Sequence, residues 1–430
     1  MTTLNSAFLL KNGTAERLYY EYAQNLPIID YHNHLSVADI AEDRQFDSLY
    51  DLWIASDPYK HRLMRILGIE EHFITGGATP YEKVERFFSV FPFLAGNPVY
   101  DWGRMELSAI FGIEELPSKD NARYIFDKTK EMLKGREFST KGILSKFNIE
   151  YISPVASLTD DLQLFDGTRV APSLRGDNLL SPDADLKEQL SAKTGINISD
   201  VHSYLAAVST LLDDFAAKGC RFADHALDDG FFDEGNKVKQ YMLICLAEEY
   251  KKRNLTLLLH LDAKRKTSER LARLAGPAGG YAGVGGRLNI SALTDMLGKM
   301  EASNSLPDTV LFPLNMNDQA PLAVLQGSFS EDGVESKVQL GPAWWWCDHS
   351  LGIENTLNAI ASFGAVSSFI GMTTDSRSIL SFVRHDYFRR ILCSWFAKLC
   401  EERDLELPFE LQGEFIERIA YFNAKKRIKR

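Results

Sequence analysis

The sequence predicts an α/β fold, a distorted (β/α)8 TIM-type barrel, because strand-like and helix-like patterns alternate along the chain. Short apolar runs that end in polar residues are separated by helical patterns, which implies a parallel sheet. Eight such units suggest a closed barrel. The eight runs span residues 26–34, 149–157, 169–175, 220–228, 256–263, 309–315, 338–346 and 369–375.

The size and composition of the chain agree with this fold class. Its 430 residues are 45% hydrophobic and 25% charged, which is ordinary for a soluble globular protein. A (β/α)8 barrel can take most of that length as one domain. We therefore expect a single metal-dependent barrel domain over residues 1–430.

A long segment without strand character, residues 35–145, follows the first apolar run. It carries helix-like patterns at 46–54, 62–67 and 81–90, broken by glycine and proline. These patterns predict a mostly helical insertion that covers the mouth of the barrel. A second irregular segment, 276–286, is rich in glycine but matches no phosphate-binding pattern, and we expect a mobile loop there.

Charge and cysteine usage limit the class of partner. The net charge of −11 disfavours nucleic acid and membrane surfaces as partners. The five cysteines have irregular spacing and no Cys-x-x-Cys pattern, which is typical of reduced intracellular thiols. No secretory signal pattern opens the sequence, and no apolar run is long enough to span a bilayer. We expect a cytoplasmic enzyme.

The first apolar run ends in His32 and His34, a pair that can bind a metal. Residues two apart in a strand point to the same side, and imidazole is a common ligand of divalent metals. Asp375 ends the eighth run, and strands 8 and 1 are neighbours in a closed barrel. Two histidines and one carboxylate leave coordination positions open for substrate or water. The alternatives are ordinary loop histidines and a helix-capping aspartate.

Other polar and aromatic residues near the expected strand ends can serve a substrate. Arg175 and Arg377 can clamp a carboxylate bidentately, although isolated arginines more often form surface salt bridges. We expect Arg384, Arg389 and Arg390 on the outer face of a helix over 384–393. The remaining candidates are Tyr59, His225, His260 and Trp344. Each could equally be an ordinary packed or hydrogen-bonded residue without a functional role.

Several sequence blocks together resemble one known family. Residues 371–378 read Gly-Met-Thr-Thr-Asp-Ser-Arg-Ser, and residues 384–393 read Arg-His-Asp-Tyr-Phe-Arg-Arg-Ile-Leu-Cys. Further blocks are Asp-Tyr-His-Asn-His-Leu at 30–35, Ser-Leu-Tyr-Asp-Leu-Trp at 48–53, Tyr-Lys at 59–60, Asn-Pro-Val-Tyr at 97–100, Asp-His-Ala-Leu-Asp at 224–228 and Gly-Pro-Ala-Trp-Trp at 341–345. In this order they are similar to the uronate isomerase (glucuronate isomerase) family of the amidohydrolase superfamily.

The resemblance implies a distorted (β/α)8 barrel with one divalent metal ion, usually zinc. It implies interconversion of D-glucuronate with D-fructuronate and of D-galacturonate with D-tagaturonate, with a proton moved between C2 and C1 of the sugar acid. Carried over by position, it makes His32, His34 and Asp375 the metal ligands, Asp375 and Tyr59 the catalytic residues, and Arg377, Arg175, Tyr59, His225 and Trp344 the substrate-binding residues. We also expect a homo-oligomer.

The chain departs from the family pattern around the expected substrate pocket, at Pro58, Leu174, Asp262 and the stretch 347–349. The metal triad is unaffected, so an isomerase of a different sugar acid stays open as an alternative. A metal-dependent hydrolase on the same scaffold is a second alternative, although strand 4 ends in His225 and Asp228, which disfavours its two-metal form. A sugar-acid-binding protein without turnover is a third.

Overall fold

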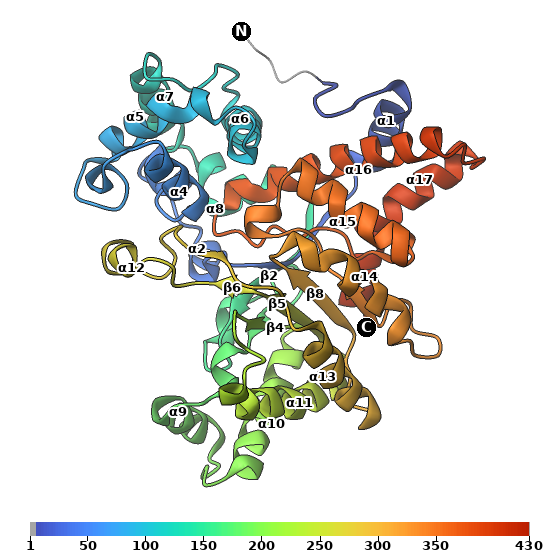
Figure 1. The fold of residues 1–430 in the computed structure, drawn as a ribbon. Coiled ribbons are helices and arrows are strands. Elements are labelled where there is room, and N and C mark those ends of the chain that lie inside the picture. The colour runs from blue at the N-terminus through green and yellow to red at the C-terminus, as the bar shows by residue number, and fades with distance from the viewer. Residues whose placement is uncertain (1–5, 430) are drawn as a thin grey trace.

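A computed structural model of the protein describes residues 6–429 and has a curled, parallel α/β sheet at its centre (Figure 1). The sheet has seven strands in the order β1-β2-β3-β4-β5-β8-β9, and all neighbouring pairs are parallel. A two-stranded antiparallel hairpin, β6-β7, stands apart from it. The strands are β1 (Ile28–Asn33), β2 (Ile149–Ala156), β3 (Ser173–Arg175), β4 (Phe222–Leu227), β5 (Thr256–Leu261), β6 (Ala263–Lys264), β7 (Gly283–Val284), β8 (Thr309–Pro313) and β9 (Val338–Leu340).

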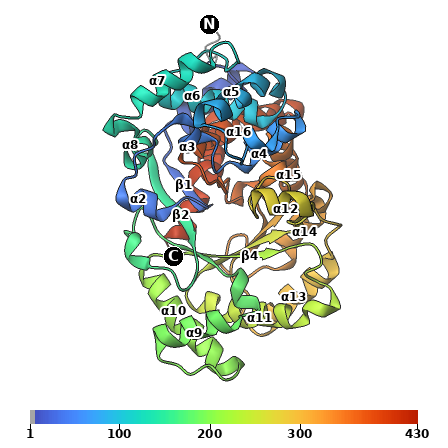
Figure 2. The ribbon, with the colours of Figure 1, turned by 90° about the vertical axis from the view of Figure 1, so that its left-hand side faces the viewer.

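Helices surround this sheet, and Figure 2 places α3–α7 at one end of the molecule and α9–α11 at the other. The α-helices are α1 (Gly13–Leu18), α2 (Val37–Glu42), α3 (Leu49–Trp53), α4 (Pro58–Ile66), α5 (Pro80–Val90), α6 (Pro98–Phe111), α7 (Ala122–Met132), α8 (Thr140–Ser145), α9 (Ala184–Thr194), α10 (Val201–Ala217), α11 (Lys237–Lys252), α12 (Glu269–Ala275), α13 (Ile290–Ala302), α14 (Gln319–Ser328), α15 (Ser350–Phe363), α16 (Val383–Glu402), α17 (Phe409–Glu417) and α18 (Asn423–Ile428).

The central strands are buried on both faces. Every residue of β1 and β5 is buried, and Leu257, Leu258 and Leu259 are completely inaccessible. Strands of a parallel sheet that is covered on both sides read as continuous apolar runs. For this reason the short apolar runs in the sequence correctly predicted the seven strands of the sheet.

The predicted eighth strand, residues 369–375, is not a regular strand, and that prediction is wrong. The segment does lie against both edge strands, because Ile370 N donates to Gln339 Oε1 of β9 at 2.9 Å and Asp375 N donates to His32 O of β1 at 3.2 Å. Gly371 and Asp375 have positive φ angles of 85° and 46°, which a regular strand does not allow. The ladder is therefore broken at both ends of the segment.

The chain between β1 and β2 is helical and contains α2–α8, with no strand among residues 34–148. The helix-like patterns at 46–54, 62–67 and 81–90 correspond to α3, α4 and α5. Helix α4 begins earlier than expected because the Asp57 carboxylate accepts hydrogen bonds from the backbone N–H groups of Tyr59 and Lys60, and Pro58 occupies the first helical position. This cap fixes Tyr59 in the first turn of the helix.

The glycine-rich segment 276–286 packs on α4 and contains the unpredicted strand β7. Arg65 donates to the carbonyl of Gly279, and Arg62 donates to that of Ala282. Gly280 has a φ of 77° and lies so close to α4 that a Cβ atom there would collide with the carbonyl oxygen of Pro58. These contacts join the glycine-rich segment to the helix that carries Tyr59.

Candidate metal centre and active site

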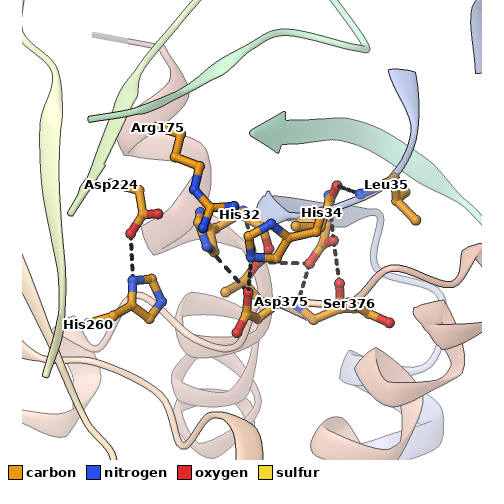
Figure 3. A network of polar contacts seen from close by, with 12 residues as sticks. His32, His34, Leu35, Arg175, Asp224, His260, Asp375 and Ser376 are labelled. Atoms are coloured by element: carbon orange, nitrogen blue, oxygen red, sulfur yellow. Dashed lines mark hydrogen bonds and ion pairs between the residues drawn. The ribbon is translucent and has the colours of Figure 1, made fainter. Parts of the chain in front are cut away.

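His32, His34 and Asp375 meet at the ends of β1 and of the segment beside it (Figure 3). One carboxylate oxygen of Asp375 lies 3.4 Å from Nε2 of His32 and 3.0 Å from Nε2 of His34. His32 and Asp375 are buried, and His34 keeps 15% of its side chain exposed. The structure therefore brings the three predicted metal ligands together.

A network around Asp30 holds these ligands in register. The Asp30 carboxylate accepts hydrogen bonds from the hydroxyls of Thr373 and Thr374, the backbone N–H of Thr374 and the side chain of Asn33, and it contacts His385 at 3.2 Å. Asp30 itself is completely buried. Because Asp30 precedes His32 and both threonines precede Asp375, the network replaces the regular ladder that is missing between the two segments.

The three ligand atoms fit a divalent cation. They lie within 4.8 Å of one another, and they comprise the two imidazole nitrogens and one carboxylate oxygen that zinc and similar ions take. Oδ1 of Asp375 is buried without a hydrogen bond of normal geometry, so it is available to a cation. Burial raises the pKa of Asp375, but the adjacent imidazoles outweigh that effect and lower the pKa well below its usual value.

Asp224 of β4 and His260 of β5 lie beside this group (Figure 3). Nδ1 of His260 is 2.6 Å from the Asp224 carboxylate, and Nε2 of His260 is buried with no hydrogen-bond partner in the described part of the chain. These two residues form a second possible metal-binding group with His32, in which the ligand atoms again lie within 4.8 Å of one another. A carboxylate that holds one nitrogen of a histidine orients the other nitrogen toward a metal or a reacting atom.

His225 does not reach the site, contrary to the sequence-based expectation. Its Nε2 lies 2.8 Å from the hydroxyl of Tyr250 on α11, on the opposite side of β4 from Asp224. Successive residues of a strand point to opposite faces, so only one of the pair can face the metal group. Asp224 takes that position.

A cavity of about 430 Å³ opens above His34 and Asp375. Its wall comes from both the strand ends and the helical segment between β1 and β2. The lining residues include Asp57, Tyr59, Arg175, Arg265, Lys266, Tyr281, Trp345, Trp346 and Arg377. A cavity of this size with a few convergent polar groups suits a small polar molecule.

Guanidinium groups gather at this cavity. Arg175, Arg265 and Arg377 all line it, and burial together with the Arg175 and Arg265 charges lowers the pKa of Arg377 despite the nearby Asp375 carboxylate. Arg175 and Arg265 also approach carboxylates, at 3.4 Å from Asp177 and 2.8 Å from Asp228. Cations placed this close together repel one another unless an anion lies between them, so the cluster favours an anionic ligand.

Tyr59 places a hydroxyl at the cavity from the side opposite the strands. The ring lies edge-on against Trp102 and Trp346, at centroid distances of 5.7 and 5.3 Å. Its hydroxyl is buried and has no hydrogen-bond partner among residues 6–429. Burial raises the pKa of Tyr59 well above its usual value, while the Arg384 cation acts in the opposite direction. Tyr59 therefore presents a protonated hydroxyl that is free to contact a ligand.

Arg384 and Arg389 are buried, at 2% and 4% exposure, so their predicted position on an outer helix face is wrong. Only Arg390 keeps partial exposure. Helix α16 packs against α1, α6 and α15, so it has no fully exposed face along this stretch. Arg384 points toward the cavity wall, where its guanidinium lies 3.5 Å from Asp348.

Trp344 does not line the cavity as expected. It packs edge-on against His260 at a centroid distance of 4.7 Å and tilted against Trp345 at 4.8 Å, and it is 4% exposed. The next two tryptophans, Trp345 and Trp346, line the cavity instead. The run of three aromatic residues signalled a pocket wall, but the sequence could not tell which ring faces inward.

The sequence reasoning also missed Arg265, Asp224 and Asp57. Arg265 lies five residues after His260, just past the end of β5, and a basic residue so near a strand end was an available signal. Asp224 was adjacent to the residue that was chosen. Asp57 reads as an ordinary helix cap, and nothing in the sequence marks it as a cavity residue.

A curled parallel sheet has two histidines at the end of one strand and a carboxylate on the adjoining segment, and arginines line the cavity above them. This arrangement defines an α/β enzyme with a candidate metal centre. The family model described as glucuronate isomerase matches residues 1–244 and 232–427. The chain belongs to this uronate isomerase family. Uronate isomerases from Caldanaerobacter subterraneus and Histophilus somni are 34% and 35% identical to it, over 98% and 100% of both chains.

A solved structure supports the same relationship. The crystal structure of uronate isomerase from Thermotoga maritima matches the whole chain with a TM-score of 0.89 and 25% identity, and the whole of that chain is covered. The glucuronate isomerase structure from Caulobacter crescentus matches with a TM-score of 0.86 over 97% of this chain and 94% of its own, at 22% identity. Within residues 6–429, no helix combines the length and apolar character needed to cross a membrane.

Proposed function

We propose that the protein interconverts D-glucuronate with D-fructuronate and D-galacturonate with D-tagaturonate. The observation that carries the proposal is that His32 meets His34 and Asp375, and that the latter two line a cavity whose wall carries several arginines. The relatives with full-length similarity are named uronate isomerases. A hexuronate has the negative charge and the size that such a cavity accepts.

We infer that His32, His34 and Asp375 hold one divalent ion, which we take to be zinc. When bound, the ion supplies a Lewis acid that stabilises negative charge on substrate oxygens. The chain contributes the fixed positions of the three ligands, because Asp30 ties the two segments that carry them. A preorganised charge-stabilising site contributes a large share of the rate in such reactions.

Asp375 and Tyr59 are the proposed proton-transfer residues. Conversion of the aldose to the ketose removes a proton from C2 and from the C2 hydroxyl, and it delivers protons to C1 and to the C1 oxygen. Both residues line the cavity, Asp375 with a carboxylate of low pKa and Tyr59 with an unpartnered hydroxyl. A carboxylate that accepts a proton and a phenol that donates one can serve the two directions of transfer.

Arg377 and Arg175 bind the substrate carboxylate in this proposal, and Arg265 adds a third cation. Bidentate guanidinium contacts fix both the position and the orientation of a carboxylate. Binding energy from this remote group orients the reacting carbons toward the metal-ligand residues and Tyr59. Trp345 and Trp346 provide aromatic faces for the sugar ring. His225 and Trp344 have no part in this arrangement.

Four further expectations remain proposals. Residues 1–430 form one barrel domain, residues 35–145 are the insertion that covers its mouth, the protein is cytoplasmic, and it forms a homo-oligomer without a nucleic-acid partner. The position of Tyr59 on α4, at the cavity, supports a covering role for the insertion. Light scattering of the purified protein tests the oligomeric state.

The test of the main proposal is proton NMR of the zinc-loaded protein with each aldose in D2O. We expect ketose signals to appear for D-glucuronate and D-galacturonate, together with transfer or exchange of the C2 proton. Absence of both signals for both sugars would contradict the proposal. Turnover of only a different sugar acid would retain the reaction and change the substrate.

The group formed by His32, Asp224 and His260 could hold an ion, so one alternative to test is a two-metal hydrolase on the same scaffold. Metal analysis of the purified protein separates the two functions. One ion per chain supports the isomerase, whereas two ions together with hydrolysis of a sugar-acid ester or lactone support the hydrolase. The named relatives favour the isomerase.

A further inference from the structure

Arg384 joins the two sides of the cavity, and the proposed function does not use it. We propose that Arg384 is a positioning residue that fixes Tyr59 relative to the segment carrying Asp375, so that the proton-donating phenol and the metal ligands keep one geometry. This inference rests on the proposed role of Tyr59 in proton transfer. It assigns no direct substrate contact to Arg384, which does not line the cavity.

On the strand side, Arg384 contacts the segment that carries Asp375. Its Nη1 donates to the carbonyl oxygen of Thr374, the residue before Asp375, at 3.3 Å. The same nitrogen lies 3.5 Å from the carboxylate of Asp348, in the loop that follows Trp345 and Trp346. Both partners are buried, so water does not compete for these contacts. Arg384 is thus bonded to two segments of the strand-side wall.

On the helical side, Arg384 lies against two aromatic rings. Its guanidinium carbon is 3.8 Å from the centroid of Trp102 on α6 and 5.0 Å from the centroid of Tyr59 on α4. A cation is attracted to the face of an aromatic ring, and the attraction is stronger where both groups are buried. The two rings themselves meet edge-on, with an interplanar angle of 88°. The cation therefore holds the ring of Tyr59 in place without bonding its hydroxyl.

Charge explains why a cation occupies this buried position. Asp57, Asp348 and Asp375 act on Tyr59 from the surrounding elements, and Arg384 acts in the opposite direction. Asp57 is already paired with Lys60 and Asp375 with the two histidines, so Asp348 is the carboxylate that depends on Arg384. An unpaired carboxylate in a buried site is costly, so a cation here offsets the charge of this group. Burial, and to a lesser degree Asp375, raise the pKa of Asp348 to about 7, while Arg384 lowers it. Removal of the guanidinium would therefore take the cation away from the buried Asp348 carboxylate.

Arg389 provides a matched control on the same helix. It is also buried on α16, and its Nε also lacks a partner. Its guanidinium bonds the carbonyl oxygens of Leu26 and Pro27 at 2.9 and 2.8 Å, before β1 and away from the cavity lining. Substitution of Arg389 removes a buried arginine of the same helix and leaves the contacts between Arg384 and Tyr59 intact.

The experiment compares R384M, R384K and R389M in the zinc-loaded, full-length protein. We measure kcat, KM and metal content, and we place 3-fluorotyrosine at position 59 for ¹⁹F NMR. We expect R384M to lose about 10- to 100-fold in kcat, the range typical of residues that orient a functional group, with KM changed less than about threefold and metal content unchanged. Its ¹⁹F resonance should shift or broaden. R384K should recover part of kcat, since it keeps the charge but not the planar stacking.

R389M should lower the melting temperature while its kcat and ¹⁹F resonance stay close to those of the parent protein. The proposal is overturned if R384M keeps the parent kcat and resonance, or if R389M changes both to the same extent. If R384M does not fold, the same comparison between R384K and R389M decides. If the parent protein shows no isomerase activity, the proposed function fails, and the ¹⁹F comparison still tests the link between Arg384 and Tyr59.

Discussion

The two sides of the cavity are built by different means. On the strand side, His32, His34 and Asp375 stand at the ends of hydrogen-bonded segments, and a buried carboxylate ties those segments together. On the helical side, Tyr59 stands in the first turn of α4, which is held by a cap, by packed aromatic rings and by contacts with the glycine-rich segment. A hydrogen-bond network around a buried carboxylate fixes the first side, and a helix cap and aromatic packing fix the second.

This difference suggests a division of labour. Ligands of a metal tolerate little displacement, so they belong on the most constrained backbone of the fold. Groups that contact a substrate can come from loops and helices, which vary more freely. The departures at Pro58, Leu174, Asp262 and 347–349 all lie outside the His32, His34 and Asp375 triad. Substitutions on the strand side should therefore lower metal content and turnover together, whereas substitutions on the helical side should lower turnover alone.

The largest effect is expected on the strand side, for Asp375→Asn. The variant keeps the size of the side chain but loses the charge, so it weakens metal binding and removes a proton acceptor together. We expect kcat/KM to fall by about 10⁴-fold or more and metal content to drop. Activity assays with metal analysis by mass spectrometry check both results. Full metal occupancy with near-normal activity would contradict the assignment of Asp375.

The matching substitution on the helical side is Tyr59→Phe, for which we expect a smaller loss of activity and no loss of metal. The ring and its contacts with Trp102 and Trp346 remain, and only the hydroxyl is removed. We expect kcat to fall by about 10²- to 10³-fold with unchanged metal content. Tyr100→Phe is the control, because Tyr100 stacks on Phe91 and does not line the cavity. A loss of metal in Tyr59→Phe would mean that the two sides are not separate.

A third prediction tests what holds the strand side together. Asp30→Asn keeps a side chain of similar shape but cannot accept all the hydrogen bonds that the carboxylate receives from Thr373, Thr374 and Asn33. We expect zinc affinity to fall by about 10- to 100-fold, as for other residues that orient metal ligands. Competition with a chelator of known affinity measures it.

Asp386→Asn is the control for Asp30, since Asp386 bonds Tyr19 and Arg390 and does not line the cavity. At saturating zinc, kcat of Asp30→Asn should recover most of its value. If zinc affinity is unchanged, the network around Asp30 contributes to stability alone.

The same difference explains what the sequence could predict. His32 and His34 were accessible because a strand has a fixed period of two and a barrel collects its strand ends at one edge. On β4 the alternation of side chains was equally predictable, but the sequence did not show which set of alternate residues faces the site. His225 was therefore chosen, whereas Asp224 is the residue that faces the site. The eighth strand was overpredicted because its apolar character reflects burial, whereas Gly371 and Asp375 break its backbone geometry.

On the helical side, sequence reasoning had no comparable rule. Tyr59 was found through resemblance, and its partners Trp102 and Arg384 come from other helices. Helix α16 was expected to have an outer face, but α1, α6 and α15 cover it, so a charged residue such as Arg384 can be buried there. Which helices cover which face depends on the path of the whole insertion, and no local pattern encodes that path.

The smallest effect concerns the glycine-rich segment that closes the helical side, and it is predicted for Asp262→Asn. Asp262 follows β5 with a φ of 65°, and its carbonyl oxygen accepts a hydrogen bond from Gly285 N at 2.7 Å. Burial, together with the carboxylates of Asp318 and Asp229, raises the pKa of Asp262 to about 7. The folded protein therefore binds a proton that the unfolded chain releases near pH 4.

Stability due to this proton is present at low pH and is lost as the pH rises toward and through 7, since the folded-state pKa lies above the unfolded value. Asparagine cannot ionise and tolerates a positive φ, so Asp262→Asn should raise the melting temperature by about 2–4 °C at pH 8 and by less at pH 5, where only part of this stability has been lost. Differential scanning calorimetry at both pH values measures this.

Asp43 is the matched control for this last prediction, because it is also an aspartate at positive φ, 55°, at the end of α2. The shift in its pKa has the opposite sign: burial raises the pKa, but hydrogen bonds from Ser139 and Lys141 and the nearby cations together outweigh burial and lower it. Asp43→Asn should therefore give no gain at pH 8. If both variants raise the melting temperature equally, the benefit comes from asparagine in a left-handed conformation. If only Asp262→Asn does so, the loss of stability at pH 8 comes from the buried charge of Asp262. This residue bonds the glycine-rich segment, and that segment helps to hold α4 and Tyr59 at the cavity.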